Sequence, residues 1–386
     1  MLFTKNSQSL FFLAFPLYLI ALVVLIIVRP IDFYKTPDQK WAVQSVEFAG
    51  SEPFIDGFPA PENLKFSATN LPHDWKGENL ALEGVYRAEW TSDELTLDRN
   101  VSGNGNQYAV YIPRVMQNAA IFINQQWIGQ GGSFNPTAHG WNQPLYFEFD
   151  AATLSSSANE IVIYVSGYVA DDNLLSQVYI GPQTIIKPSF DRQNLIHVGA
   201  VEWTSSLTAF LAIFMTVLWL KRSKDSVYGW LALACASLWV LSFNFTVSDI
   251  PFGYENWQST MFAAQGWTIV FLVMSCYRVL NKPSKLVEYG MFSMAMGGAV
   301  LLFVFSYAFA DYLYVYLYTV WNMACLALGA YSFGRMLYGT INSRRFNHLS
   351  ILLVPTSFTV ACAIRDNLIL LGIFDRSLPL FNFYGF

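Results

Sequence analysis

The sequence predicts a multidomain membrane protein with an all-β domain inserted after its first membrane helix. Of its 386 residues, 54% are hydrophobic and only 13% are charged, whereas a soluble globular domain carries about 25% charged residues. Long uncharged segments occur at the start of the chain and again after residue 203. The segment between them holds 9 Lys and Arg against 20 Asp and Glu, and its hydrophobic residues alternate with the period of a β-strand.

Residues 1–29 are predicted to be a short cytoplasmic start and a membrane anchor. Residues 10–28 carry no charge, and at about 1.5 Å per residue this run roughly matches a hydrocarbon core about 30 Å thick. Arg29 and Pro30 follow directly, where a cleaved signal peptide would have small residues. We therefore expect an uncleaved transmembrane helix, with a cleaved signal peptide as the alternative.

Residues 30–203 are predicted to form a β-sandwich. Alternating hydrophobic residues mark four strands, and turn signals separate them; the strands are expected near 108–112, 120–122, 145–149 and 161–165. Many short strands without a convincing helix are typical of a sandwich, and the length suits an eight-stranded jelly roll. All four cysteines lie after residue 203, so no disulfide stabilises this domain.

Residues 204–386 are predicted to form an α-helical membrane bundle. Six apolar segments are expected at 204–220, 226–247, 259–280, 289–310, 313–338 and 349–374. Lys and Arg occur in alternate loops, which by the positive-inside rule places the N-terminus in the cytoplasm and residues 30–203 outside.

The last residues look like the start of a seventh core helix. Only about nine residues remain, whereas a span needs about 20. We expect a truncated chain, with a short interfacial tail as the alternative.

The middle segment resembles a known domain over residues 60–167. The resemblance rests on Leu71-Pro72-His73-Asp74-Trp75, Gly84-Val85-Tyr86-Arg87, Tyr108–Pro113, Ala120–Asn124 and Trp127-Ile128-Gly129. These motifs resemble the N-terminal, sugar-binding-type jelly roll of glycoside hydrolase family 2, which has a galactose-binding-like fold. That family has an Asn-Gly turn where this chain has Asn124-Gln125-Gln126, and we expect a less tight hairpin here. The catalytic barrel is absent, so the resemblance implies no glycosidase activity.

Residues 197–386 resemble the bacterial seven-transmembrane receptors with diverse intracellular signalling modules. The motifs are Arg365-Asp366-Asn367-Leu368 through Gly372, then Leu378-Pro379 and Tyr384-Gly385. The resemblance implies the sensory part of an inner-membrane signal-transduction receptor. Its output would be a histidine kinase of a two-component system or, alternatively, a GGDEF-type diguanylate cyclase. A homodimer is expected if the output is a kinase.

Six residues of the β domain are candidates for binding a small molecule or carbohydrate. Aromatic rings offer stacking faces and amides offer hydrogen bonds, and function often lies in loops at the end of a rigid sandwich. The candidates are Trp75, Arg87, Trp127, Asn135, His139 and Trp141. Each has a structural alternative. Trp75 would pack in the core, the loop of residues 130–143 would cover a hairpin, and Arg87 would pair with Glu89 or another nearby acid.

Arg365 and Asp366 are the candidate intramembrane coupling residues. Ionisable groups in a bilayer are costly and usually face a bundle interior or pair with one another. Adjacent residues do not share a helix face, so we expect partners on other helices, with Asn322 and Gln265 as polar candidates. The pair is interpreted either as a contact that shifts on signalling or as static glue between helices.

Other function classes are not supported. The sequence shows no GxSxG, HExxH or P-loop motif, and its four histidines are far apart. We expect no catalytic site, metal or cofactor in this chain. A pI near 5.4 argues against nucleic-acid binding, so the expected partners are a periplasmic ligand and the lipid bilayer. The alternatives of another class are a membrane-anchored carbohydrate-binding module and a transporter or transporter accessory protein.

Overall fold

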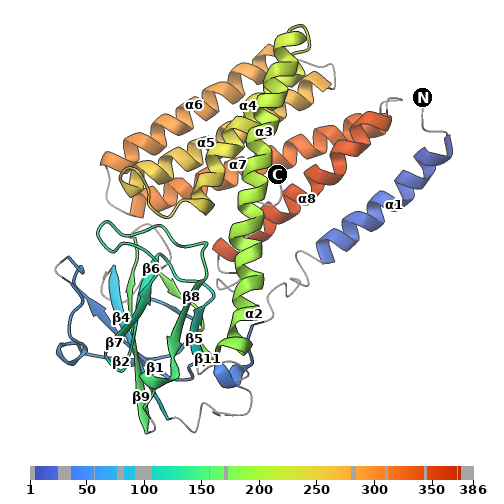
Figure 1. The fold of residues 1–386 in the computed structure, drawn as a ribbon. Coiled ribbons are helices and arrows are strands. Elements are labelled where there is room, and N and C mark those ends of the chain that lie inside the picture. The colour runs from blue at the N-terminus through green and yellow to red at the C-terminus, as the bar shows by residue number, and fades with distance from the viewer. Residues whose placement is uncertain are drawn as a thin grey trace. The chain divides into compact units, whose positions relative to one another are not determined.

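The computed structural model describes most of the chain as two compact units (Figure 1). The described residues are 5–24, 36–55, 57–75, 82–91, 107–155, 157–168, 173–279, 284–308, 312–342, 346–371 and 373–374. We call residues 33–202 together with 245–252 the β unit, and residues 1–32, 203–244 and 253–386 the helical unit. The β unit therefore includes a short segment from the connection between two later helices.

The β unit is built from antiparallel strands. They are β1 (Val46–Ser51), β2 (Ser67–Thr69), β3 (His73–Asp74), β4 (Glu83–Thr91), β5 (Gln107–Ile112), β6 (Asn118–Ile123), β7 (Gln126–Gln130), β8 (Leu145–Asp150), β9 (Ala158–Ser166), β10 (Leu174–Leu175) and β11 (Tyr179–Pro182). One sheet has the order β2-β1-β4-β9-β6-β7, a second has β11-β5-β8, and β10 pairs with β3. The four strand runs expected from alternation correspond to β5, β6, β8 and β9, so those expectations are confirmed.

The core lies between the two larger sheets. Along β9, Ile161, Ile163 and Val165 join this core, whereas Val162 and Tyr164 point to the opposite face. That opposite face, which we call the outer face, has a smaller aromatic cluster of its own. Both faces of β9 are thus buried along its central part, which explains why residues 161–165 are all apolar.

The hairpin between β6 and β7 is tighter than the sequence predicts. Only Asn124 and Gln125 separate the two strands, and both have positive φ, 50° and 66°. This is the geometry of a two-residue type I′ turn, in which Asn-Gly is favoured. The expectation of a looser hairpin was wrong because the Asn124 side chain holds the turn. Its Nδ2 donates to the Thr153 carbonyl at 2.8 Å, and its Oδ1 accepts from the Glu160 amide at 2.9 Å.

A helix, α2 (Gln183–Asn194), also forms where the sequence showed no convincing helix. It contains Pro188 and is weakly amphipathic, so its sequence signal is poor. Tertiary packing decides its structure. Ile186 is fully buried, and the Phe190 ring stacks on Tyr146 with 4.7 Å between centroids. The remaining short helical turns are η2 (Gln39–Trp41), η3 (Pro61–Asn63) and η4 (Ala151–Thr153), with a π-helical segment η5 (Leu195–Gly199) after α2.

The helical unit contains long apolar helices. They are α1 (Lys5–Val23), α3 (Ala200–Lys221), α4 (Ser226–Thr246), α5 (Tyr254–Val279), α6 (Lys285–Ala308), α7 (Tyr312–Asn342) and α8 (Phe346–Leu370). Among the described residues, four helices are long and apolar enough to cross a membrane: Gln183–Lys221, which joins α2, η5 and α3, then Ser226–Thr246, Tyr254–Val279 and Lys285–Ser306. The chain is therefore a membrane protein.

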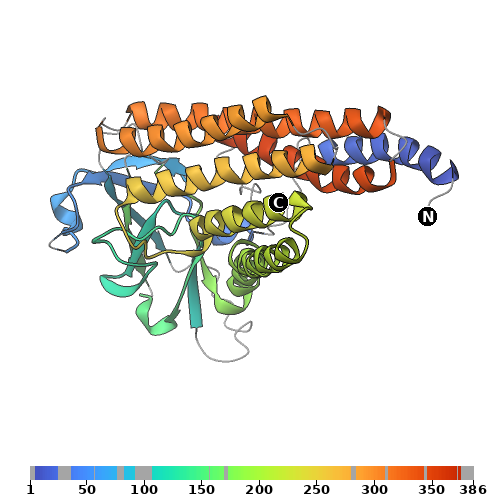
Figure 2. The same ribbon diagram turned by 90° about the horizontal axis from the view of Figure 1, so that it is seen from above.

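Contacts within the helical unit follow a simple order (Figures 1 and 2). Helices α6 and α7 both pack on α5, α8 packs on α7, and α1 packs on α8. Phe15 of α1 lies in a cluster with Met336 and Leu353, and Leu22 lies in another with Cys362. The first helix is thus part of the bundle. The expected seventh core helix falls on residues 375–386, outside the described residues.

Candidate functional site

A row of side chains crosses the outer face of the six-stranded sheet and contains two of the predicted binding residues. Strand register aligns Glu47 with Arg87, Arg87 with Val162, Val162 with Phe122, and Phe122 with Trp127. Directly opposed residues in antiparallel strands share one face. The structure therefore brings Arg87 and Trp127, 40 residues apart in sequence, into one line across β4, β9, β6 and β7.

Arg87 is held by an ion pair on this face. Its Nη2 donates to Glu47 Oε2 at 2.7 Å, and its guanidinium lies 4.5 Å from the centroid of the Phe66 ring. The hydrogen bond that Arg87 donates to Glu47 raises the pKa of Arg87, so its charge is fixed. The expected pairing with a nearby acid is found, but with Glu47 on β1 rather than Glu89. The Arg87 side chain as a whole is 30% exposed.

Trp127 is the most solvent-exposed aromatic residue of the row. It is 56% exposed, and its opposed neighbour Phe122 packs into the aromatic cluster of Phe58 and Tyr164. Burial raises the pKa of Tyr164 to about 12, so its hydroxyl stays neutral while it donates to the Pro59 carbonyl at 2.8 Å. The indole thus projects from a rigid apolar base, an arrangement that suits stacking against a ligand ring.

Carboxylates lie on the same face beside this row. Glu160 precedes Val162 by two residues on β9 and is directly opposed to Glu89 of β4. Partial burial raises the pKa of Glu160, and the neighbouring Glu89 and Glu62 raise it further, while Arg87 opposes them. The face therefore offers one aromatic platform, one guanidinium and several hydrogen-bond acceptors, a combination that suits hydroxyl groups on a sugar.

Trp75 is not on this surface. Its side chain is fully buried in the main core, next to the rings of Phe48 and Tyr86 at 6.3 and 6.1 Å. A ligand cannot stack on it in this structure. The position matches the structural alternative weighed for the His73-Asp74-Trp75 motif.

The loop of residues 130–143 begins on the outer face. Phe134 inserts its ring into the aromatic cluster there, 5.1 Å from Phe58 and 5.8 Å from Phe54. The following residue, Asn135, is exposed. The first half of the loop is therefore anchored beside the row that contains Trp127, and Asn135 is available at its tip.

The second half of the same loop contacts two segments far along the chain. The His139 amide donates to the Ser248 carbonyl at 2.8 Å, and the Trp141 ring lies 5.2 Å from Phe245. Both His139 and Trp141 are buried, with 3% and 8% exposure. These two predicted ligand residues thus form a contact inside the protein, with the connection between α4 and α5.

Asn142 joins this contact to the helix that leaves the β unit. Its Nδ2 donates to the His197 carbonyl at 2.8 Å and lies 3.4 Å from the Phe245 carbonyl. Its Oδ1 lies 3.0 Å from His197 Nδ1. His197 belongs to the π-helical segment η5, and such segments often mark functional positions in helices. One side chain therefore bridges the loop, η5 and the last turn of α4, directly before the α4–α5 connection.

Sequence reasoning missed Asn142, Phe134, Ser248 and His197. It treated the loop as a surface feature and the α4–α5 connection as an unremarkable link between helices. The available signal was weak: the loop is long for a hairpin, with two aromatic residues and several amides. Contacts between residues about 100 positions apart have no local sequence signature.

The predicted intramembrane pair lies in α8 and is deeply buried. Arg365 and Asp366 are 1% and 2% exposed, and Arg365 Nη1 lies 3.2 Å from Asp366 Oδ1. The two adjacent residues thus contact one another, and the expected partners on other helices stay a prediction. Among the described residues, no hydrogen bond joins Asn322 or Gln265 to either of them. Pairing within α8 is possible because the long guanidinium can fold back along its own helix.

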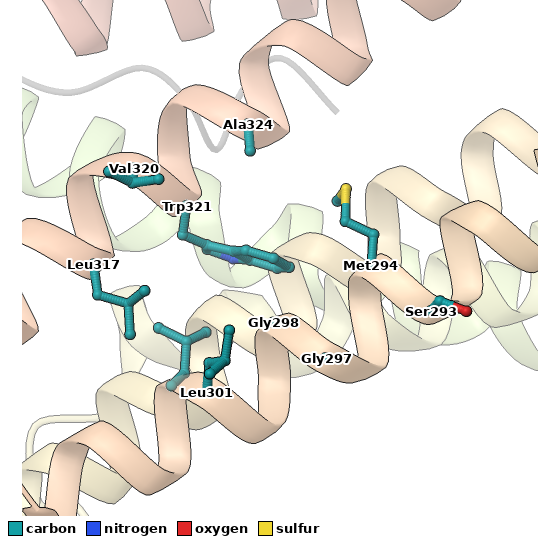
Figure 3. Close-up of a pocket in the computed structure, with 10 residues that line it drawn as sticks. Ser293, Met294, Gly297, Gly298, Leu301, Leu317, Val320, Trp321 and Ala324 are labelled. Atoms are coloured by element: carbon teal, nitrogen blue, oxygen red, sulfur yellow. The ribbon is translucent and has the colours of Figure 1, made fainter.

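A groove of about 350 Å³ lies between α6 and α7 (Figure 3). Its floor is the Trp321 ring against Gly298, and its walls include Leu301 and Val320. The indole nitrogen donates to the Phe262 carbonyl of α5 at 2.9 Å, which fixes the ring between three helices. The lining is almost wholly apolar, so the groove offers no polar anchor for a transported sugar.

Among the described residues, no group of three or more His, Cys, Asp or Glu side chains is placed to hold a metal ion. In the β unit, Glu47, Glu89 and Glu160 lie near Arg87 and form a cluster of carboxylates around it.

Comparisons with known proteins give distant likenesses. The sequence matches no protein-family model. Over 217 residues it is 23% identical to the facilitated trehalose transporter Tret1 of Bombyx mori, covering 53% of this chain and 39% of that protein. The chain thus spans about two fifths of the length of that relative.

Similar solved structures are enzymes of glycoside hydrolase type. They include a calcium-binding mutant of Bacteroides uniformis beta-glucuronidase 2, with a TM-score of 0.25, 16% identity, and coverage of 36% of this chain and 17% of that chain. A glycosyl hydrolase family 2 member from Bacteroides cellulosilyticus has a TM-score of 0.26 and 17% identity, covering 36% of this chain and 20% of its own. These scores are too low to assign a fold or an activity.

Proposed function

We propose that this chain is the sensory and membrane part of a bacterial signal-transduction receptor whose β unit binds a carbohydrate. The observation that carries the proposal is the Asn142 bridge. A loop anchored beside Trp127 contacts both the helix that leaves the β unit and the connection between α4 and α5. A ligand that prefers one arrangement of this loop would thereby shift the equilibrium between two states of the attached helices.

Within this proposal the β unit is a jelly roll of galactose-binding-like type. Two antiparallel sheets with non-consecutive neighbours, such as β4 beside β9, support that description. The unit lies on the periplasmic side of the inner membrane, because the loops rich in Lys and Arg fall on the other side. The output is a histidine kinase or, alternatively, a diguanylate cyclase. The choice between them rests only on the resemblance in domain order.

Carbohydrate binding is tested with the purified full chain in nanodiscs against a broad panel of oligosaccharides. We expect at least one to bind, and Trp127→Ala to weaken its affinity about tenfold, because a stacked aromatic ring contributes about 1–1.5 kcal/mol. Trp127→Phe should restore most of the affinity, and Gln126→Ala, an exposed neighbour on the same strand, should leave it unchanged. Absence of binding to the whole panel, or equal affinities for wild type and Trp127→Ala, would contradict the proposal.

A second candidate is a sugar transporter or its accessory protein, favoured by the distant likeness to the trehalose transporter. A transport path needs polar residues near the middle of the membrane. The buried Arg365–Asp366 pair is such a feature, but the groove between α6 and α7 is apolar. Uptake of labelled trehalose into proteoliposomes discriminates the two candidates: a receptor accumulates none, whereas time-dependent accumulation would favour transport.

A further inference from the structure

Arg335 of α7 lies among tyrosines at one end of the helical unit. Its guanidinium is 5.9 Å from the centroid of the Tyr277 ring of α5, a cation–π distance. The hydroxyls of Tyr277 and Tyr331 are 3.0 Å apart. The Arg335 guanidinium lies within hydrogen-bonding reach of the Tyr277 hydroxyl. One guanidinium and two phenol hydroxyls therefore converge. One hydroxyl donates to the other, which leaves the guanidinium and one hydroxyl proton to donate to a further group.

Among the described residues, no ion pair to Arg335 is found. Glu288 of α6 pairs with Arg278 of α5 at 2.6 Å. Between residues 256 and 365 the only other acid is Asp311. Arg335 thus has no counter-ion among the described residues, and an anion from outside the chain can pair with it.

One nitrogen of Arg335 also lacks an acceptor. Its Nε is buried and has no hydrogen-bond partner among the described residues. A buried donor left unsatisfied is unfavourable, and a charged arginine in a membrane protein normally has a counter-ion. Four more basic residues occur in the sequence near the ends of these helices: Lys282 before α6, Lys285 as its first residue, and Arg344 and Arg345 between α7 and α8. The sequence at this end of α5, α6 and α7 is thus rich in basic residues, and Arg335 itself has an unsatisfied donor.

The surroundings of Arg335 are those of a membrane interface. Tyr331 is 47% exposed, Tyr338 is 59% exposed, and on α6 Tyr289 is 70% exposed. Tyrosines gather where hydrocarbon meets headgroups, and Arg binds phosphate through two parallel hydrogen bonds. We propose that Arg335, with the hydroxyls of Tyr277 and Tyr331, binds the phosphate group of an anionic phospholipid.

The test uses the purified full chain titrated with phosphatidylglycerol or phosphatidylcholine and observed by native mass spectrometry. We expect wild type to bind phosphatidylglycerol preferentially, and Arg335→Gln to weaken that binding about fivefold, the effect of one basic residue at a membrane surface. Arg335→Lys should retain part of the preference. Tyr331→Phe, which leaves the charge in place, should weaken it less than Arg335→Gln.

Arg222→Gln is the matched control, because Arg222 is exposed and lies in a loop rich in Lys. The proposal is overturned if Arg222→Gln and Arg335→Gln weaken binding equally, since the attraction would then be general. It is also overturned if Arg335→Gln binds phosphatidylglycerol as wild type does. Stabilisation of wild type by millimolar inorganic phosphate in lipid-free detergent, lost in Arg335→Gln, would assign the site to soluble phosphate instead. None of these outcomes depends on a carbohydrate ligand or on signalling.

Discussion

At the scale of the residue, exposure separates side chains that look alike in the sequence. Trp75 and Trp127 are both candidate ligand residues in the sequence, yet one is fully buried and the other is 56% exposed. Trp75 stabilises the core through its contacts with Phe48 and Tyr86. Only Trp127 can present a ring to a ligand. Both side chains are indoles with the same chemistry. Their place in the sheets decides whether the ring packs in the core, as in Trp75, or faces solvent, as in Trp127.

Glu83, the first residue of β4, is an acid whose burial disfavours its charged form. It is 8% exposed, its Oε1 accepts a long hydrogen bond of 3.4 Å from Ser166, and no ion pair to it is found in the described part of the chain. Burial raises the pKa of its carboxyl. The protonated form is therefore favoured in the folded state, so its stabilising effect is present at acidic pH and is lost as pH rises through the raised pKa.

We expect Glu83→Gln to stabilise the β unit by about 1 kcal/mol at pH 7.5, because the amide avoids burial of a charge. The same substitution should have little effect near pH 4, where the wild-type carboxyl is protonated. Thermal unfolding of the full chain in detergent at both pH values checks this. Glu89→Gln, an exposed acid on the same strand, is the control. Equal destabilisation by Glu83→Gln at both pH values would contradict the explanation.

At the scale of the element, small residues decide how closely helices approach. Gly298 of α6 faces the flat Trp321 ring of α7, and a methyl group at that position would overlap the ring. Gly297, the preceding residue, has open space beside it. The two glycines are adjacent in sequence but lie on different sides of α6, so only one of them is needed for packing.

We expect Gly298→Ala to destabilise the helical unit by about 1–3 kcal/mol through overpacking against Trp321. Gly297→Ala should be neutral or slightly stabilising, because alanine favours a helix more than glycine does. Thermal stability in detergent, read by size-exclusion chromatography after heating, distinguishes the two. If both variants lose stability to the same extent, the contact with Trp321 is not the cause.

At the scale of the whole molecule, the β unit includes residues 245–252 as well as its own continuous segment. The chain thus connects the two units through more than one segment: the helix from Gln183 to Lys221, and both ends of the α4–α5 connection. Asn142 hydrogen-bonds to the first and lies beside the second. A change in the loop would therefore affect both connections together.

We expect Asn142→Ala to raise hydrogen exchange at the His139 amide and in residues 195–199 by about fivefold to tenfold, the loss of roughly one buried hydrogen bond. In wild type a bound oligosaccharide should change exchange in residues 245–252, and Asn142→Ala should abolish that change while retaining binding. Asn135→Ala, on the exposed tip of the same loop, should leave apo exchange unaltered. A ligand effect on residues 245–252 that survives in Asn142→Ala would rule out this bridge as the route.

The sequence by itself determined the class of protein, the apolar segments and the main strands, because these depend on local periodicity and on the length of uncharged runs. It also gave Arg87 and Trp127 as binding candidates, which stays a prediction, though not that they share one row. Only the tertiary structure decided that Trp75, His139 and Trp141 are buried, that Asn124-Gln125 forms a tight turn, and that α2 is a helix. It also decided that Arg365 pairs with Asp366 and that Asn142 bridges three segments. These features depend on contacts between residues far apart in the chain, and such contacts leave no periodic pattern in the sequence around them.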